Sequence, residues 1–501
     1  MKKLVILLFL VPAITSMAQK KVNPKTYSKA ITIEDMKSNL YTLAGDEMEG
    51  RETATEGQRR AAMFIENKFK SYGLLPGNKG SYQMQFPVYT DSLVNALLTV
   101  NETVFEAGKD FSFNVGANHT AGYDFSQVLF LGFGISDSTR DDYKDIDARG
   151  KLVMVLSPNF AGNIAPQNRR AFNSFTQQLA AMSHGAVALL VVEPKISEMT
   201  DKSSMYVNKY HSAIRINTFL VSEKIAKAIM GGEYTGEKAA TQQGKPVAKS
   251  FDANVAVAID KKRLALQSSN VLGLLEGTDL KDEYVILSAH YDHLGKRGNT
   301  IWYGADDDAS GTTSILELAK AFSKAKAEGK GPRRSILFMT VSGEEKGLWG
   351  SDYYGDHPVY PLNKTTVDLN IDMVGRIDPN RKYGDSTNYI YVIGDDKLSS
   401  DLKPISESIN KKYTKLELDY KYNDPNDPER IYYRSDHYNF AKHGVPVIFY
   451  FSGLHADYHK PTDTPDKINY ELMKKRILLV YYTAWEMANR TDMLKRDIPL
   501  N

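Results

Sequence analysis

The chain has 501 residues, 42% of them hydrophobic, and its 63 lysine and arginine residues nearly balance its 61 acidic residues. A chain of this length is expected to form about two or three domains, and the net charge of +2 gives no electrostatic basis for binding nucleic acid or an anionic membrane surface. Because the chain has no cysteine, it forms no disulfide, and any zinc ligand must be His, Asp or Glu.

The N-terminal 18 residues have the pattern of a secretory signal peptide. Two lysines precede the apolar stretch 4–14, and the small-x-small sequence Ser-Met-Ala follows at 16–18. The stretch is too short to span a bilayer, and no later stretch is long and apolar enough to do so. We therefore expect cleavage after Ala18, export to the periplasm or out of the cell, and no stable membrane insertion.

Two amphipathic helices are expected after a polar linker. Thr32 precedes the first apolar-periodic stretch and is placed to begin a helix. Thr55 and Gln58 have the spacing of a capping box at the start of the second helix. Gly73 suits the position just past its end.

The segment 96–254 has a different character from the rest of the chain. Short β-rich runs at 128–131, 152–156 and 186–192 are accompanied by one helical stretch at 175–183. The segment carries no set of histidines and carboxylates at ligand spacing. We predict an inserted, mostly β module without chemistry of its own.

From Asn270 onward, long apolar runs alternate with helical patterns, as in α/β proteins. The expected strands are 271–275, 284–289, 335–341, 367–373, 389–393 and 445–451, and the expected helices are about 309–326, 397–411 and 469–489. The predicted fold is α/β, with a mixed, largely parallel central sheet flanked by helices. Residues 19–95 and 255–501 form this domain, and 96–254 is the insert.

Metal-binding side chains follow the ends of several predicted strands. They are His290 and Asp292, Asp307 within GADDDASG, Glu344 and Glu345, Asp372, and the later His459. The carboxyl ends of parallel strands meet at one edge of a sheet, where ligands bind in open α/β folds. Imidazole and carboxylate ligands in one place suit zinc. Each residue alone has an ordinary structural explanation, but together they predict a metal site.

This set resembles the co-catalytic dizinc exopeptidases, a family that includes bacterial leucyl aminopeptidases, glutamate carboxypeptidase II and the transferrin receptor. The family pattern is HxD, GAxDxxSG, a Glu-Glu pair, a strand-end Asp, and a late His followed by T/P-x-D-T. It corresponds here to HYD at 290–292, GADDDASG at 304–311, Glu-Glu at 344–345, Asp372, and His459 before TDT at 462–464. GRETATEG near residue 50 resembles the family's opening, and DARGKLVMVLSP and HGAVALLVV resemble its protease-associated domain.

The resemblance implies two Zn²⁺ ions per chain and a role for each residue. In these roles, Asp307 bridges the ions, Glu345 and His459 complete one site, His290 and Asp372 complete the other, Asp292 fixes the ring of His290, and Glu344 is the general base. Physical chemistry agrees, since two neighbouring zinc ions need a bridging carboxylate and a shared water whose pKa they lower toward about 7.

Other histidines have weaker claims. His455 competes with His459 for the late ligand position, and the Thr-Asp-Thr sequence downstream favours His459. His293 is interpreted as a loop residue, and His437 as a structural residue or pocket wall.

The sequence thus predicts an exported aminopeptidase that removes N-terminal residues from peptides through a zinc-bridging water and a glutamate base. Three alternatives stay open. A glutamate carboxypeptidase-like enzyme needs cations for the substrate carboxylate, and Arg376 and Arg434 are the candidates. A glutaminyl cyclase uses one zinc and usually lacks the insert. A non-catalytic receptor-like module would have lost ligands that this chain retains. Side-chain preference and oligomeric state do not follow from the sequence.

Overall fold

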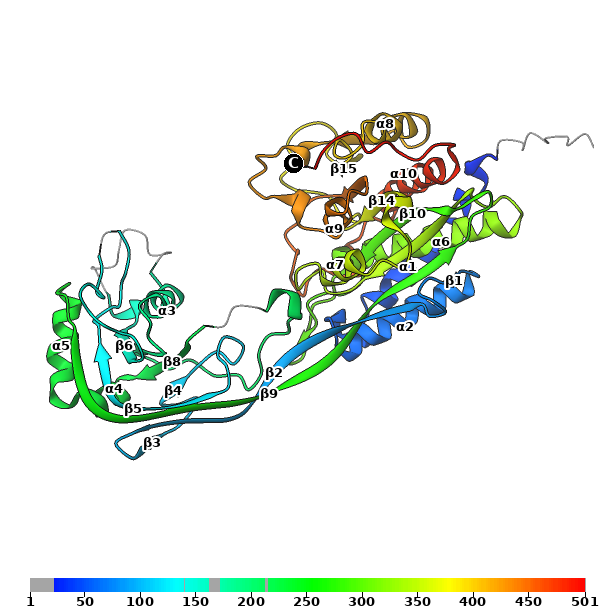
Figure 1. The fold of residues 1–501 in the computed structure, drawn as a ribbon. Coiled ribbons are helices and arrows are strands. Elements are labelled where there is room, and N and C mark those ends of the chain that lie inside the picture. Colours follow the sequence, from blue (N-terminus) through cyan, green and yellow to red (C-terminus); the bar gives the residue numbers. More distant parts are fainter. Residues whose placement is uncertain (1–21, 139, 162–171, 212–214, 501) are drawn as a thin grey trace, which may run out of the picture. The chain divides into compact units, whose positions relative to one another are not determined.

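The structure is a computed structural model, and it describes residues 22–138, 140–161, 172–211 and 215–500 (Figure 1). The expected signal peptide lies outside these residues. The chain divides into two compact units: the first unit is Met1–Gln85 with Ser268–Asn501, and the second unit is Phe86–Gln267. The expected insert, 96–254, falls within the second unit, whose boundaries lie further out on both sides.

The first unit is built around a mixed, largely parallel sheet, which confirms the predicted fold class. The strands run in the order β16-β15-β17-β14-β10-β13-β9. β10 pairs in parallel with β13 and β14, and β14 pairs in parallel with β17, while β9 and β15 introduce the antiparallel pairs. The strands are β1 (Leu75–Pro76), β9 (Lys249–Leu275), β10 (Leu280–His290), β13 (Arg334–Val341), β14 (Thr365–Ile371), β15 (Tyr389–Ile393), β16 (Glu417–Asp419) and β17 (Val447–Phe451), with the small hairpin β11 (Lys296–Arg297) and β12 (Thr300–Ile301) apart from the sheet.

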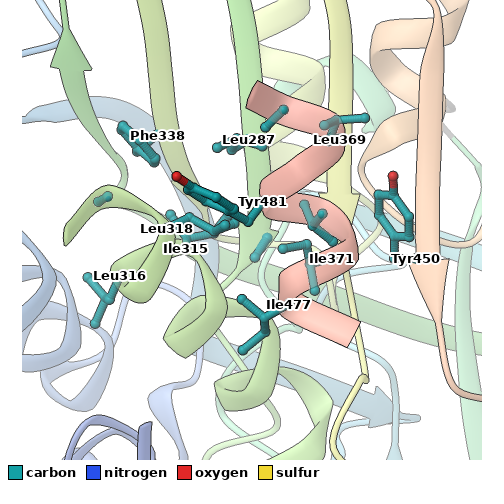
Figure 2. Packing of buried hydrophobic residues seen from close by; sticks show 14 of the residues in the cluster. Leu287, Ile315, Leu316, Leu318, Phe338, Leu369, Ile371, Tyr450, Ile477 and Tyr481 are labelled. Carbon is teal, nitrogen blue, oxygen red and sulfur yellow. The ribbon is translucent and has the colours of Figure 1, made fainter. Parts of the chain in front are cut away.

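Helices bury both faces of this sheet, because successive strand residues point to opposite sides. Val285 and Leu287 of β10 join one core, and Ile286 between them joins another. Figure 2 shows the first core, where Ile477 and Tyr481 lie among strand residues. The helices of this core are α1 (Ile33–Leu43), α2 (Glu56–Ser71), α6 (Gly311–Ala327), α8 (Leu402–Tyr413) and α10 (Tyr470–Asn489), and those of the other core are α7 (Trp349–Asp356) and α9 (His437–Lys442).

The start of α2 differs from the predicted capping box. Thr55 Oγ1 accepts a hydrogen bond from the backbone N–H of Gln58 at 3.5 Å. The Gln58 side chain donates instead to the hydroxyl of Tyr291, directly after β10. This contact ties the helix to the strand end that carries His290. Gly73 follows the helix at φ +77°, as the sequence predicts.

The second unit has a sheet and cores of its own. Its strands run β9-β5-β6-β7-β8-β4, and β5 to β8 are parallel to one another. Beyond the predicted α3, the described residues also form α4 and α5, so the unit is less purely β than expected. Its remaining elements are β2 (Gln83–Val100), β3 (Thr103–Phe105), β4 (Phe111–Ser112), β5 (Ala121–Phe130), β6 (Leu152–Leu156), α3 (Ser174–Ser183), β7 (Ala188–Glu193), β8 (Asn217–Ser222), α4 (Glu223–Met230) and α5 (Tyr234–Gln242).

The carboxyl ends of the central strands lie side by side in the first unit. His290 is the last residue of β10 and is paired with Val341, the last residue of β13. Asp372 directly follows β14. This edge of the sheet therefore collects the predicted site residues. In the described part of the chain, no helix is both long and apolar enough to cross a membrane.

Candidate metal centre

Two groups of side chains converge at this edge and share Asp307. His290 Nε2 lies 3.2 Å from Asp307 Oδ1 and 3.6 Å from Asp372 Oδ1. His459 Nε2 lies 3.2 Å from Asp307 Oδ2 and 3.1 Å from Glu345 Oε2. The two oxygens of Asp307 thus face two different histidines, each accompanied by a second carboxylate.

These separations fit zinc. Two ligand atoms on a tetrahedral zinc ion, each bonded at about 2.0–2.1 Å, lie about 3.3 Å apart, and the four separations here run from 3.1 to 3.6 Å. His290 Nε2 and Asp307 Oδ2 are buried and have no hydrogen-bond partner among the described residues. Buried polar atoms of this kind are costly unless something binds them. A cation held between the side chains would satisfy them.

Asp307 is aimed at the site because its two neighbours are held elsewhere. Asp306 Oδ1 accepts a hydrogen bond from the backbone N–H of Gly375 at 2.6 Å. Asp308 Oδ1 accepts one from the backbone N–H of Met373 at 3.0 Å. These bonds fasten both flanking carboxylates to the segment after β14. Of the three successive aspartates, Asp307 alone therefore faces both histidines.

The structure separates the two late histidines. His459 faces Asp307 and Glu345, whereas His455 Nε2 lies 3.3 Å from Asp306 Oδ2. The nearby Asp463 accepts hydrogen bonds from the backbone N–H groups of Asp306 at 3.0 Å and Asp307 at 3.2 Å. Burial, followed by the charge of Asp306, raises the pKa of Asp463 to about 6. His455 and Asp463 thus support the loop that presents Asp307.

Asp292 connects the end of β10 to the Glu-Glu pair. His290 Nδ1 lies 3.1 Å from the backbone oxygen of Asp292 and 3.7 Å from its carboxylate, so the backbone oxygen is the nearer partner. The carboxylate accepts hydrogen bonds from Thr53 Oγ1 at 2.7 Å and from the backbone N–H of Glu344 at 3.2 Å. The residue holds both the histidine ring and the start of the Glu-Glu segment.

The neighbouring carboxyl groups of Glu344 and Glu345 have opposite electrostatic environments. Burial raises the pKa of Glu344 well above its usual range; the charge of His290 opposes this rise, and the charges of Glu345 and Asp372 add to it. Burial also raises the pKa of Glu345, but its contacts with His293 and His459 outweigh burial and lower it. Two carboxyl groups whose pKa values are shifted in opposite directions are suited to different tasks. One can move a proton, and the other stays ionised.

Arg51 is a site-building residue that the sequence patterns did not mark. Its buried guanidinium donates to the backbone oxygens of Tyr291 at 2.7 Å, Tyr303 at 2.8 Å and Gly304 at 2.9 Å. It therefore joins the segment after His290 to the start of the Asp307 loop. The signal available in the sequence was only its place in the GRETATEG stretch that resembles the family's opening.

A small pocket opens beside the two groups. Its acidic wall consists of Asp307, Glu344 and Asp372, and its remaining lining is Met373, Ile431, Arg434, Phe449, Phe451, Leu454 and Tyr458. The ring of Tyr458 stacks on His459 with centroids 3.8 Å apart, and its hydroxyl accepts from Arg434 at 3.2 Å. Arg376 is instead paired with Asp457 at 3.1 Å.

Curated proteins that match part of this chain include aminopeptidases. The probable leucine aminopeptidase of Trichophyton verrucosum is 30% identical over 217 residues, which cover 42% of this chain and 56% of that protein. Aminopeptidase YwaD of Bacillus subtilis is 26% identical over 200 residues, which cover 40% of each protein. The chain thus spans about half the length of these relatives or less.

Solved structures share the fold. The aminopeptidase from Aneurinibacillus sp. strain AM-1 superposes with a TM-score of 0.54 at 19% identity, covering 96% of this chain and 99% of that one. BSAP, a zinc aminopeptidase from Bacillus subtilis, gives a TM-score of 0.50 at 18% identity, covering 94% and 99%. Residues 270–484, which contain both groups of candidate ligands, match the family model of Peptidase family M28. This part of the chain is therefore similar to peptidase family M28.

Proposed function

We propose that the protein is an aminopeptidase that uses two zinc ions to remove N-terminal residues from peptides. The observation that carries the proposal is the position of Asp307, whose two oxygens face His290 and His459 at the spacing of zinc ligands. One zinc would be held by His290, Asp307 and Asp372, and the other by Asp307, Glu345 and His459. Zinc bound there would polarise the scissile carbonyl and lower the pKa of the attacking water.

Glu344 is the proton carrier in this proposal. Its carboxylate lines the pocket, and its nearest ring nitrogen, His290 Nε2, is 3.9 Å away, beyond the spacing of the candidate ligands. The high pKa of the Glu344 carboxyl favours its protonated form. Zinc ions bound by the neighbouring carboxylates would lower this pKa and favour the ionised form of Glu344. The ionised carboxylate can take a proton from water and pass it to the leaving amine.

The pocket supports an apolar N-terminal residue as the preferred substrate. Its wall includes Ile431, Phe449, Phe451 and Leu454. Burying a leucine-sized side chain against such a wall is worth about 1.5–3 kcal/mol.

Carboxypeptidase activity is the second candidate, and Arg434 is the observation that favours it. Arg434 lines the pocket, where its guanidinium is placed to meet a substrate carboxylate. Arg376 is a weaker candidate for this role because Asp457 neutralises it. The guanidinium of Arg434 already donates to the Tyr458 hydroxyl at 3.2 Å, and the relatives reported above are aminopeptidases.

A substrate panel separates these activities. Aminoacyl-arylamides and peptides with free or acetylated N-termini are assayed with zinc, after chelation, and after zinc is restored. We expect hydrolysis of leucyl- and methionyl-arylamides, its loss on chelation or acetylation, and its recovery with zinc. Cleavage of blocked peptides from the carboxyl end would establish the carboxypeptidase instead. Cyclisation of N-terminal glutamine would establish the cyclase, and no turnover of any substrate would favour the receptor-like module.

We also propose that the second unit is a protease-associated-like domain and that the chain is exported. The two sequences that resemble such a domain lie on β6 and β7, which pair in parallel through Leu152 and Ala188. The charged, apolar and small-residue pattern of residues 1–18 supports export.

A further inference from the structure

Asp372 and Glu345, the two candidate ligands that contact only one histidine of the metal centre each, are held in matching ways. Asp372 directs Oδ1 toward His290, while its Oδ2 accepts a hydrogen bond from Ser435 Oγ at 2.7 Å. Glu345 directs Oε2 toward His459, and its Oε1 lies 2.7 Å from His293 Nδ1. Each carboxylate therefore has one oxygen facing the shared centre and one facing an outer side chain.

His293 is fixed in this position by the fold. Its side chain is fully buried, and its backbone N–H donates to the backbone oxygen of Arg51 at 3.2 Å. Gly304, at φ +54°, lies so close that a Cβ atom there would be 2.5 Å from the His293 ring. In the described part of the chain, neither ring nitrogen of His293 makes a hydrogen bond of regular geometry, and the same is true of Glu345 Oε1. Glu345 is thus the close polar contact of this ring.

The distances distinguish a zinc ligand from a residue that orients one. Two ligand atoms on one tetrahedral zinc ion are about 3.3 Å apart, and His459 Nε2 meets that spacing with Asp307 and Glu345 at 3.2 and 3.1 Å. His293 Nδ1 is 2.7 Å from Glu345 Oε1, too close for two such ligands, and 3.8 Å from Asp307 Oδ2. A separation of 2.7 Å is that of a direct polar contact between a ring nitrogen and a carboxylate oxygen.

We propose that His293 is a positioning residue of the zinc site formed by Asp307, Glu345 and His459. Its Nδ1–H holds Glu345 Oε1, so that Oε2 alone is presented to the metal. This inference rests on the proposed two-zinc site. Partners that orient a metal ligand typically change metal affinity by about 10–100-fold when they are removed. The effect should be confined to one of the two ions, because His293 does not contact Asp372.

The test measures zinc binding directly, without reference to peptidase activity. Metal-free wild type, His293→Leu and His293→Asn are titrated with zinc against a chromophoric chelator, and two dissociation constants are fitted. Leucine removes the donor, whereas the asparagine amide nitrogen can take the place of Nδ1. We expect His293→Leu to weaken the binding of one zinc ion by about 10–100-fold and that of the other by less than about threefold. His293→Asn should recover most of the lost affinity.

Controls separate this role from a general effect on folding. His184→Leu in the second unit, where His184 stacks on Tyr143, should leave both dissociation constants unchanged. If His293→Leu does not fold, as judged by circular dichroism, His293→Ala replaces it with the same expectation. Wild-type affinity of both ions in the donor-free variant overturns the proposal. Equal losses in His293→Leu and His293→Asn also overturn it, because the imidazole would then be a ligand. Lack of hydrolysis in the substrate panel would refute the proposed function alone.

Discussion

Replacing Glu344 with glutamine tests the division of labour between the two adjacent glutamates. Glutamine keeps the size and polarity of the side chain but cannot accept the proton. General acid–base catalysis contributes about 10²–10⁴-fold in rate, and at about 1.36 kcal/mol per tenfold the barrier should rise by about 2.7–5.5 kcal/mol. We expect kcat to fall by this factor while KM changes little.

Zinc content should distinguish Glu344 from Glu345. The carboxylate of Glu344 is 3.9 Å from His290 Nε2, whereas Glu345 Oε2 is 3.1 Å from His459 Nε2. Elemental analysis should therefore find two zinc ions in the wild type and in Glu344→Gln, and one in Glu345→Gln, with activity lost in both variants. Loss of zinc from Glu344→Gln with retention in Glu345→Gln would show that the roles are reversed. One zinc in the fully loaded wild type would favour the cyclase.

Unfolding of the metal-free variant shows whether the rate loss has a structural origin. Burial and the neighbouring carboxylates raise the pKa of Glu344, so its ionised form is unfavourable in the folded state. Metal-free Glu344→Gln should accordingly unfold at the same temperature as the wild type or higher near pH 8. A lower unfolding temperature would mean that the substitution damages the fold, and the kinetic argument would fail.

Two further predictions concern stability and export. Burial, partly offset by Lys320, raises the pKa of Glu317 to about 7 from 4.5, so the stability that its protonated form contributes is complete below about pH 4.5 and is lost as the pH rises through about 7. Glu317→Gln should remove about 3 kcal/mol of this pH dependence, and equal slopes of unfolding free energy between pH 5 and 8 in both proteins would refute the assignment. N-terminal sequencing of exported protein should find Gln19 first, and a start at Met1 or well past Lys21 would contradict the signal peptide.

The sequence by itself determined the sheet and most of the candidate site. Buried parallel strands require continuous apolar runs, and the polar residues that interrupt them mark the strand ends. The run ending at His290 and the run before Asp372 are β10 and β14. Since the ends of parallel strands share one edge, the pattern also predicted that these two residues would meet. The distance of 3.6 Å between His290 Nε2 and Asp372 Oδ1 agrees with that reasoning.

Only the tertiary structure decided the supporting contacts, because they join residues far apart in the chain. Arg51 binds the backbone of Gly304, 253 residues away, and no local periodicity reports such a pair. His293 follows the HxD motif and looks like a loop residue, but packing against Gly304 turns its ring toward Glu345. The capping box at Thr55 failed for the same reason: the Gln58 side chain found a distant partner in Tyr291. Local patterns act over a few residues, whereas the partner of a buried polar group is chosen by the packing of the whole unit.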